Sequence, residues 1–170
     1  MTKAGKLQDS LNPENSPELT LRRRSGTLSV SAIRELSREI PGTDSDKRET
    51  ALGLLLLWHD HWSEAHKIAQ AHEGEADFDL LHGIGHRREA DYSNSEFWFN
   101  EAGKHPVFEM LVTCATSLLK DEEELRRQLF PNGKWNPSGF VRAVKARPDH
   151  PVLRAIQAEE MLCFYEYLTQ

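Results

Sequence analysis

Cysteine is scarce in this sequence, and long apolar runs are absent from it. The longest apolar candidate, residues 54–58, falls far short of the roughly 18 residues of a membrane-spanning helix, and the first residues lack the apolar stretch of a signal peptide. The formal net charge of −6 works against electrostatic capture of nucleic acid. We therefore expect a soluble, cytoplasmic protein with no membrane and no nucleic-acid partner.

Several catalytic motifs are also missing. The sequence contains no nucleophile elbow, no phosphate-binding P-loop and no dinucleotide-binding glycine pattern. Acyl transfer, phosphoryl transfer from nucleotides and hydride transfer are therefore not expected. The HExxH pattern of zinc metalloproteases is absent too, because the residue after His82 is Gly83.

The two cysteines, Cys114 and Cys163, each lie inside an apolar helical pattern, LVTCATSLL and EMLCFYEYL. In such a setting a free thiol behaves as a small hydrophobic side chain. A catalytic cysteine usually needs an electropositive, partly exposed environment, and neither neighbourhood suggests one. Both residues are predicted to be reduced and part of the core.

No segment combines period-two alternation with β-branched residues, so no strand is predicted. Residues 1–26 carry Pro13, Pro17 and several Ser and Asn with almost no aromatic side chain, a composition that cannot offset its own ordering entropy. We predict a flexible tail over residues 1–26. Residues 27–170 are predicted to form a single all-α domain of antiparallel helical hairpins with flanking helices.

Capping residues and prolines divide this domain into helices. The first is predicted over residues 32–39, with Ser31 as its N-cap and Pro41-Gly42 as its stop. The next begins near Asp46, whose spacing to Glu49 resembles a capping box. Beyond the central hairpins we predict four helices: one opening at Pro106, one from Asp121 to about Phe130, one opening at Pro137 with Asn136 as cap, and a terminal one over residues 152–168.

Two central segments align with each other without a gap. Their offset is 83 − 53 = 30 residues, and the matched pairs are Gly53 with Gly83, Trp62 with Tyr92, Ala65 with Ser95, and Ala69 with Phe99. The layout resembles the tetratricopeptide (TPR) repeat, a helix-turn-helix unit with the pattern W-x₂-L-G-x₂-Y…A-x₃-F…P. The resemblance covers residues 52–106 and implies stacked helical hairpins. His86 replaces the usual aromatic residue and Ala90 the usual turn glycine, and the period is shorter than the family's roughly 34 residues.

A second resemblance covers most of the chain beyond residue 26. The pieces HDHWSEAHKIAQ, HRREADYSNSEFWF and IQAEEMLCFYEYL are similar to segments of a group of short microbial proteins with no assigned activity. This likeness implies a shared fold and transfers no function.

Histidines crowd the central hairpins, where six of the eight lie between His59 and His86. His82 and His86 are four residues apart and share one helix face, a spacing that suits paired metal ligands or a coupled acid/base pair. His66 and Gln70 have the same spacing on the preceding helix, so we expect these four side chains to converge. The others in the crowded stretch, His59, His61 and His72, lie near turns and are predicted to be at the surface.

Charged residues follow this histidine face. Arg87 or Arg88 could clamp a carboxylate or phosphate through its planar fork, and Glu89 could orient a histidine or carry a proton. Asp60 and Asp91 are each placed to cap the helix that follows a hairpin turn.

Two functions are left open by these observations. In the first, a TPR-like domain binds a peptide or small ligand through a polar pocket of the histidine face with Gln70, Arg87 and Arg88. In the second, a small enzyme uses His66, His82 and His86 for acid/base chemistry, with Glu89 assisting and with or without a divalent metal held by His82 and His86. No cofactor is firmly implied, and the sequence indicates neither the substrate nor the oligomeric state.

Overall fold

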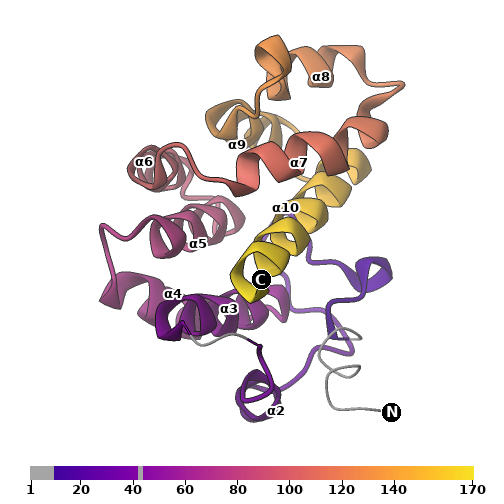
Figure 1. Cartoon of the computed structure of the whole chain (residues 1–170). Coiled ribbons are helices and arrows are strands. Elements are labelled where there is room, and N and C mark those ends of the chain that lie inside the picture. The colour runs from indigo at the N-terminus through magenta and orange to yellow at the C-terminus, as the bar shows by residue number, and fades with distance from the viewer. Residues whose placement is uncertain (1–9, 42–43) are drawn as a thin grey trace.

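The protein is all-helical. The computed structural model describes residues 10–41 and 44–170, and within those ranges there is no strand (Figure 1), which confirms the predicted all-α class. In chain order the elements are η1 (Pro13–Asn15), α2 (Val30–Ser37), α3 (Ser45–Trp58), α4 (Trp62–Ala71), α5 (Ala76–Arg88), α6 (Tyr92–Ala102), α7 (Val107–Ala115), η2 (Thr116–Leu119), α8 (Glu123–Leu129), η3 (Pro131–Gly133), α9 (Pro137–Ala146) and α10 (Pro151–Thr169). Within the part of the chain that the structure describes, none of the helices has the length and apolar character needed to cross a membrane.

Helix starts follow local capping chemistry. Asn136 caps α9 as predicted, since its side chain accepts a hydrogen bond from the Gly139 backbone N–H at 3.0 Å. Ser29 rather than Ser31 caps α2, and Asp44 caps α3, so both helices begin slightly earlier than predicted. Of the predicted Pro41-Gly42 stop, Gly42 lies outside the described residues.

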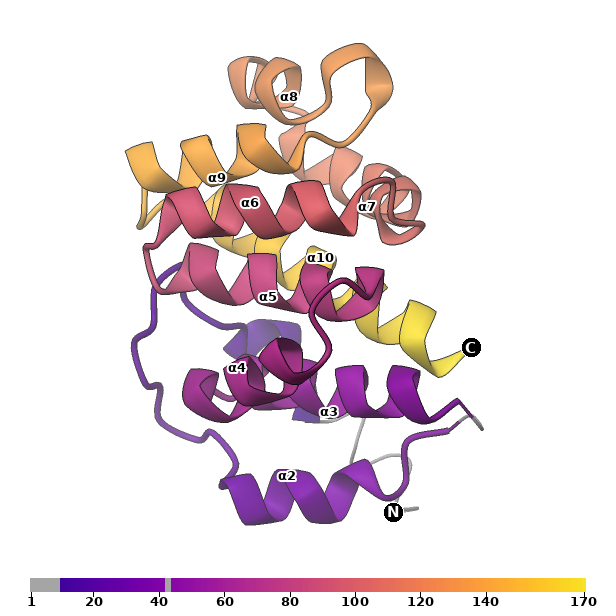
Figure 2. The ribbon, with the colours of Figure 1, turned by 90° about the vertical axis from the view of Figure 1, so that its left-hand side faces the viewer.

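The helices stack in layers. Figure 2 shows α2, then α3 with α4, then α5, α6 and α9 one above the other, with α10 crossing behind them. Neighbouring layers are in direct contact, and α10 packs against α3, α7 and α9. The long terminal helix thus joins α3, in the lower part of the stack, to α9 at its other end.

The turns of the α3–α4 and α5–α6 hairpins have the same backbone conformation. Asp60 and Ala90 both have a positive φ, 67° and 65°. The backbone N–H groups that follow them, at His61 and Asp91, bond back to the carbonyls of Leu56 and His86 at 2.9 and 3.0 Å. A non-glycine residue in the left-handed region is uncommon, so the match shows that the two hairpin turns are built in the same way.

Glycines let α5 approach its neighbours closely. A Cβ atom added at Gly85 would lie 1.9 Å from Cζ3 of Trp62, at the start of α4. One added at Gly53 would lie 2.5 Å from Cδ2 of Leu81. Any larger side chain at these positions would push the helices apart. The backbone of α5 at Gly85 therefore lies directly against the Trp62 ring of α4.

The described part of the predicted tail, residues 10–26, packs on the helices. Leu11 and Leu19 are buried, and the Leu21 backbone N–H donates to the Arg88 carbonyl at 2.9 Å. The prediction of a flexible tail is therefore wrong for this stretch, because its few apolar side chains find places in the core. Residues 1–9 of the predicted tail lie outside the described residues.

Two consecutive arginines of α5 are fully buried and paired. Arg87 makes a two-pronged ion pair with Glu160 of α10, one arm of which joins Nη1 to Oε1 at 3.2 Å, and both side chains are 0% exposed. Arg88 pairs through Nη2 with Oδ1 of Asp60 at 2.8 Å, and Asp60 also accepts from Nε of Arg24 at 3.0 Å. The sequence predicted Asp60 as the cap of α4, and that prediction is wrong. The Asp60 carboxylate instead neutralises two arginines.

Burial and pairing have opposite effects on these charges. Burial lowers the pKa of Arg88 to about 10, although Asp60 opposes the change. Burial alone would raise the pKa of Asp60, but the hydrogen bonds from Arg88 and Arg24 hold it below its ordinary value. Both groups therefore stay ionised in the folded protein at neutral pH.

We predict that Glu160→Ala lowers the free energy of unfolding by about 3–5 kcal/mol, because it leaves the Arg87 guanidinium buried without a counter-charge. The matched control is Glu96→Ala, which removes an exposed pair with Arg142 and should cost less than about 1 kcal/mol. Urea unfolding of the three proteins measures both values. Equal losses in the two variants would contradict the importance of the buried pair.

Candidate metal centre

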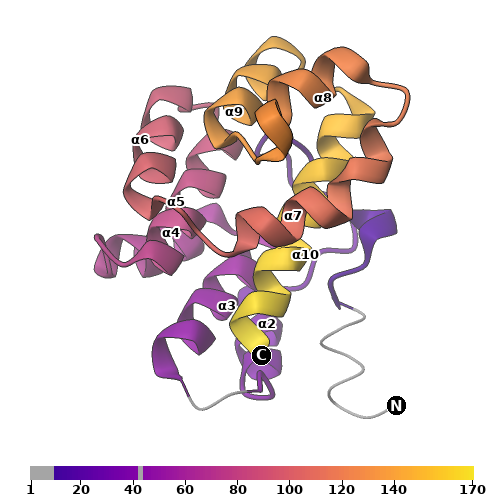
Figure 3. The same cartoon turned by 45° about the horizontal axis from the view of Figure 1, so that its top comes forward.

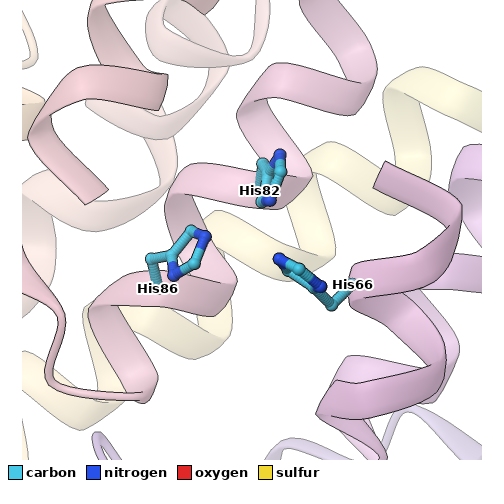
Figure 4. Close-up of side chains that lie close together, drawn as sticks. All are labelled: His66, His82 and His86. Atoms are coloured by element: carbon cyan, nitrogen blue, oxygen red, sulfur yellow. The ribbon is translucent and has the colours of Figure 1, made fainter. Parts of the chain in front are cut away.

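Three imidazoles meet where the first hairpin packs on the second. His66 projects from α4, and His82 and His86 project from one face of α5 (Figure 4). One nitrogen atom from each ring lies within 4.8 Å of the chosen nitrogens of the other two rings. Helical spacing brings the α5 pair onto a common face, and the close α4–α5 approach supplies the third.

Aromatic rings enclose this cluster. The Trp62 ring meets those of His66 and His86 edge-on, with centroids 4.8 and 5.2 Å apart. His82 stacks on Trp98 at 4.1 Å with an interplanar angle of 14°. His82 and His86 are 2% and 5% exposed, whereas His66 is only partly buried. The indole rings therefore cover part of the cluster, and His66 is its most exposed member.

His82 is the exceptional member of the cluster. Neither of its ring nitrogens has a hydrogen-bond partner among the described residues. Burial, reinforced by the neighbouring His86 and His66, lowers the pKa of His82 to about 3. The ring is therefore neutral at physiological pH and keeps a free lone pair. A buried polar group with no partner is costly, and so needs an explanation.

His86 is held in place by two partners. Its Nδ1 lies 3.0 Å from Oε2 of Glu89 and its Nε2 lies 3.1 Å from Nδ2 of Asn94. With its proton on Nδ1, the ring donates to the Glu89 carboxylate and accepts from the Asn94 amide at Nε2. Burial lowers the pKa of His86, and Glu89 opposes that change. A carboxylate on the far nitrogen is the usual support of a metal-binding histidine.

The remaining residues predicted for the site lie elsewhere. Gln70 is exposed at the end of α4, so the structure does not bring it to the three histidines. Arg87 and Arg88 are fully buried in their ion pairs and form no charged mouth, which corrects the predicted His/Arg pocket. Glu89 does reach the cluster, through His86. Asp91 caps α6 as predicted, accepting from the Asn94 backbone N–H at 3.3 Å.

Two further predictions about single residues are wrong. His59 is buried rather than at the surface, because its Nδ1 accepts the Leu28 backbone N–H at 3.3 Å. Cys114 is exposed on α7 rather than in the core, whereas Cys163 is buried as predicted.

Sequence reasoning missed three side chains around the cluster. Trp62 and Trp98 form its walls, and Asn94 bonds to His86. The contact of Asn94 could have been expected from the hairpin, since a short turn brings the first residues of α6 over the last turn of α5. The identity of the contacting side chains depends on the packing angle.

No family model, curated protein or solved structure matches this chain. The function must therefore be argued from the geometry of the site.

We predict that the metal-free protein loses stability as the pH falls below about 6.5. In the unfolded chain His82 is protonated near that pH, whereas in the folded protein its pKa is about 3, so lower pH favours the unfolded state. Each such proton contributes a slope of about 1.4 kcal/mol per pH unit. His59 and His86, whose pKa values are also lowered, add to the loss with the same sign.

The variant His82→Leu tests this assignment. Between pH 6 and 4 it should reduce the slope of the unfolding free energy against pH by up to about 1.4 kcal/mol per pH unit, the contribution of one proton, because leucine does not titrate. Urea unfolding of both chelator-treated proteins across that range measures the difference. An unchanged slope would show that His82 is not the group that resists protonation.

Proposed function

We propose that this protein binds a divalent transition metal, with Zn²⁺ as the best fit, through His66, His82 and His86. The observation that carries the proposal is the buried His82, whose two nitrogens lack partners while two further imidazoles face it. A metal ion would take up the free lone pair and remove the cost of burying it.

The donor set agrees with zinc chemistry. Neutral imidazoles are good zinc ligands, and a low pKa keeps His82 unprotonated and ready to bind. A tetrahedral ion with Zn–N bonds of about 2.0–2.1 Å needs its donors roughly 3.3 Å apart. Rotation of the three rings, whose donor atoms lie within 4.8 Å of one another, would close that gap. His86 would bind the ion through Nε2, which releases the Asn94 amide, while its Nδ1 keeps the Glu89 carboxylate.

Three protein ligands leave a fourth position open. That ligand count is typical of catalytic zinc sites, in which a bound water is acidified to a pKa near 7. The partly exposed His66 side is where such a water or a small substrate would enter. We therefore favour metal-assisted acid/base or hydrolytic chemistry over a purely structural ion, with Glu89 orienting His86 rather than touching the substrate.

The peptide-binding hypothesis has less support. It requires Arg87 and Arg88 as polar anchors, and both guanidinium groups are occupied in buried ion pairs. The part of it that we retain as a proposal is the scaffold: two divergent TPR-like units with the histidine site between them. The matching turns at Asp60 and Ala90 support that relationship.

We predict that the chelator-stripped protein takes up one Zn²⁺ per chain at this centre and gains stability from it, by about 2.7 kcal/mol at a free zinc concentration one hundred times Kd. Isothermal titration calorimetry and elemental analysis give the stoichiometry, and thermal unfolding gives the gain. All are measured in a Cys114→Ser background, which removes the exposed thiol as a competing ligand. His82→Ala and His66→Gln should each abolish the uptake.

The control variant is His72→Ala, which removes a nearby histidine that stacks on Phe78 outside the cluster and should leave zinc uptake unchanged. Circular dichroism establishes that every variant is folded. If the folded wild-type protein retained no zinc at this centre, or if the His72 and His82 variants behaved alike, the proposal would fail.

A further inference from the structure

A second group of metal-binding side chains lies where α7 crosses α10, away from the histidines in the fold. Figure 3 shows α7 passing across α10, and the two helices are in direct contact. Cys114 comes from α7, while Glu159 and Cys163 lie four residues apart on α10. One donor atom from each of the three residues lies within 4.8 Å of the other two.

The chemistry of this donor set differs from that of the histidine centre. Two sulfurs and one carboxylate oxygen select ions that favour thiolate, such as Zn²⁺ and Cd²⁺, over Mg²⁺ or Ca²⁺. Burial, together with the neighbouring Cys114 and Glu159, raises the pKa of the Cys163 thiol, and burial also raises the pKa of Glu159. Without an ion, both of these shifts favour the protonated, uncharged forms of Cys163 and Glu159.

The surroundings leave the group open to an ion. Among the described residues no cationic side chain pairs with Glu159, so no protein charge already neutralises it. Cys163 is buried, which fixes one ligand, and Cys114 is exposed, which gives an ion a way in from solvent. The open side also leaves room for water as a fourth ligand.

We propose that Cys114, Glu159 and Cys163 form a site for a thiophilic divalent cation such as Zn²⁺ or Cd²⁺, separate from the histidine centre. Binding forms two metal–sulfur bonds and one metal–oxygen bond and releases both thiol protons to solvent, so no oxidant or reductant takes part. Because protons are released, affinity at this site rises with pH. An ion here would tie α7 to α10.

The test is a Cd²⁺ titration of the reduced, chelator-stripped protein, followed by the ultraviolet sulfur-to-cadmium charge-transfer absorption. We expect a band that saturates at one site per chain. The His82→Ala variant should keep the band, which separates this site from the histidine centre. Cys114→Ser, a change at an exposed position, should lose about half of the band and weaken Cd²⁺ binding at least tenfold.

Glu159→Gln tests the carboxylate and should weaken Cd²⁺ binding about tenfold while the band keeps its shape. Its matched control is Glu124→Gln, an exposed acid on α8 outside the group, which should leave the affinity unchanged. Absence of the band in the folded, reduced protein would overturn the proposal. A second result would also overturn it: a protein that gives no cadmium band but readily forms a Cys114–Cys163 disulfide with a small disulfide oxidant. The two cysteines would then be a redox-active pair and not metal ligands.

Discussion

The burial of Arg87 and Arg88 at the end of α5 constrains the rest of the molecule. Neighbouring residues of a helix point about 100° apart, so the two side chains leave α5 in different directions. Arg87 reaches Glu160 on α10, and Arg88 reaches Asp60 in the first hairpin turn. Because an unpaired buried charge is very costly, α5 can take only the rotation that satisfies both pairs.

That rotation also sets the histidine centre. With the arginines directed towards α10 and the first turn, His82 and His86 face α4 and meet His66. Gly85 permits the contact by leaving room for the Trp62 ring, which lies against two of the histidines. The ion pairs, the glycine and the three imidazoles are therefore parts of one packing solution between the two hairpins.

Local patterns in the sequence predicted what depends on neighbours along the chain. The all-α class, the Asn136 cap and the shared face of His82 and His86 all follow from spacings of three or four residues. The convergence of His66 on that face follows from the short connection between α4 and α5, residues 72–75.

Partners distant in sequence were not predictable in this way. Arg87 looks like a surface charge because its partner Glu160 is 73 residues away, and His59 looks exposed because its partner Leu28 is 31 residues away. The packing of Leu19 likewise depends on a surface that exists only in the folded stack. Composition alone therefore gave a flexible tail and a charged pocket in place of a docked segment and two buried pairs.

The most direct measurement of the central claim is X-ray absorption at the zinc edge, made on Cys114→Ser protein loaded with one equivalent of Zn²⁺ so that the sulfur group does not compete. The account predicts a four-coordinate ion with three imidazole nitrogens at about 2.0–2.1 Å and one oxygen. A first shell of oxygens alone, with no imidazole scattering, would contradict a metal centre at His66, His82 and His86.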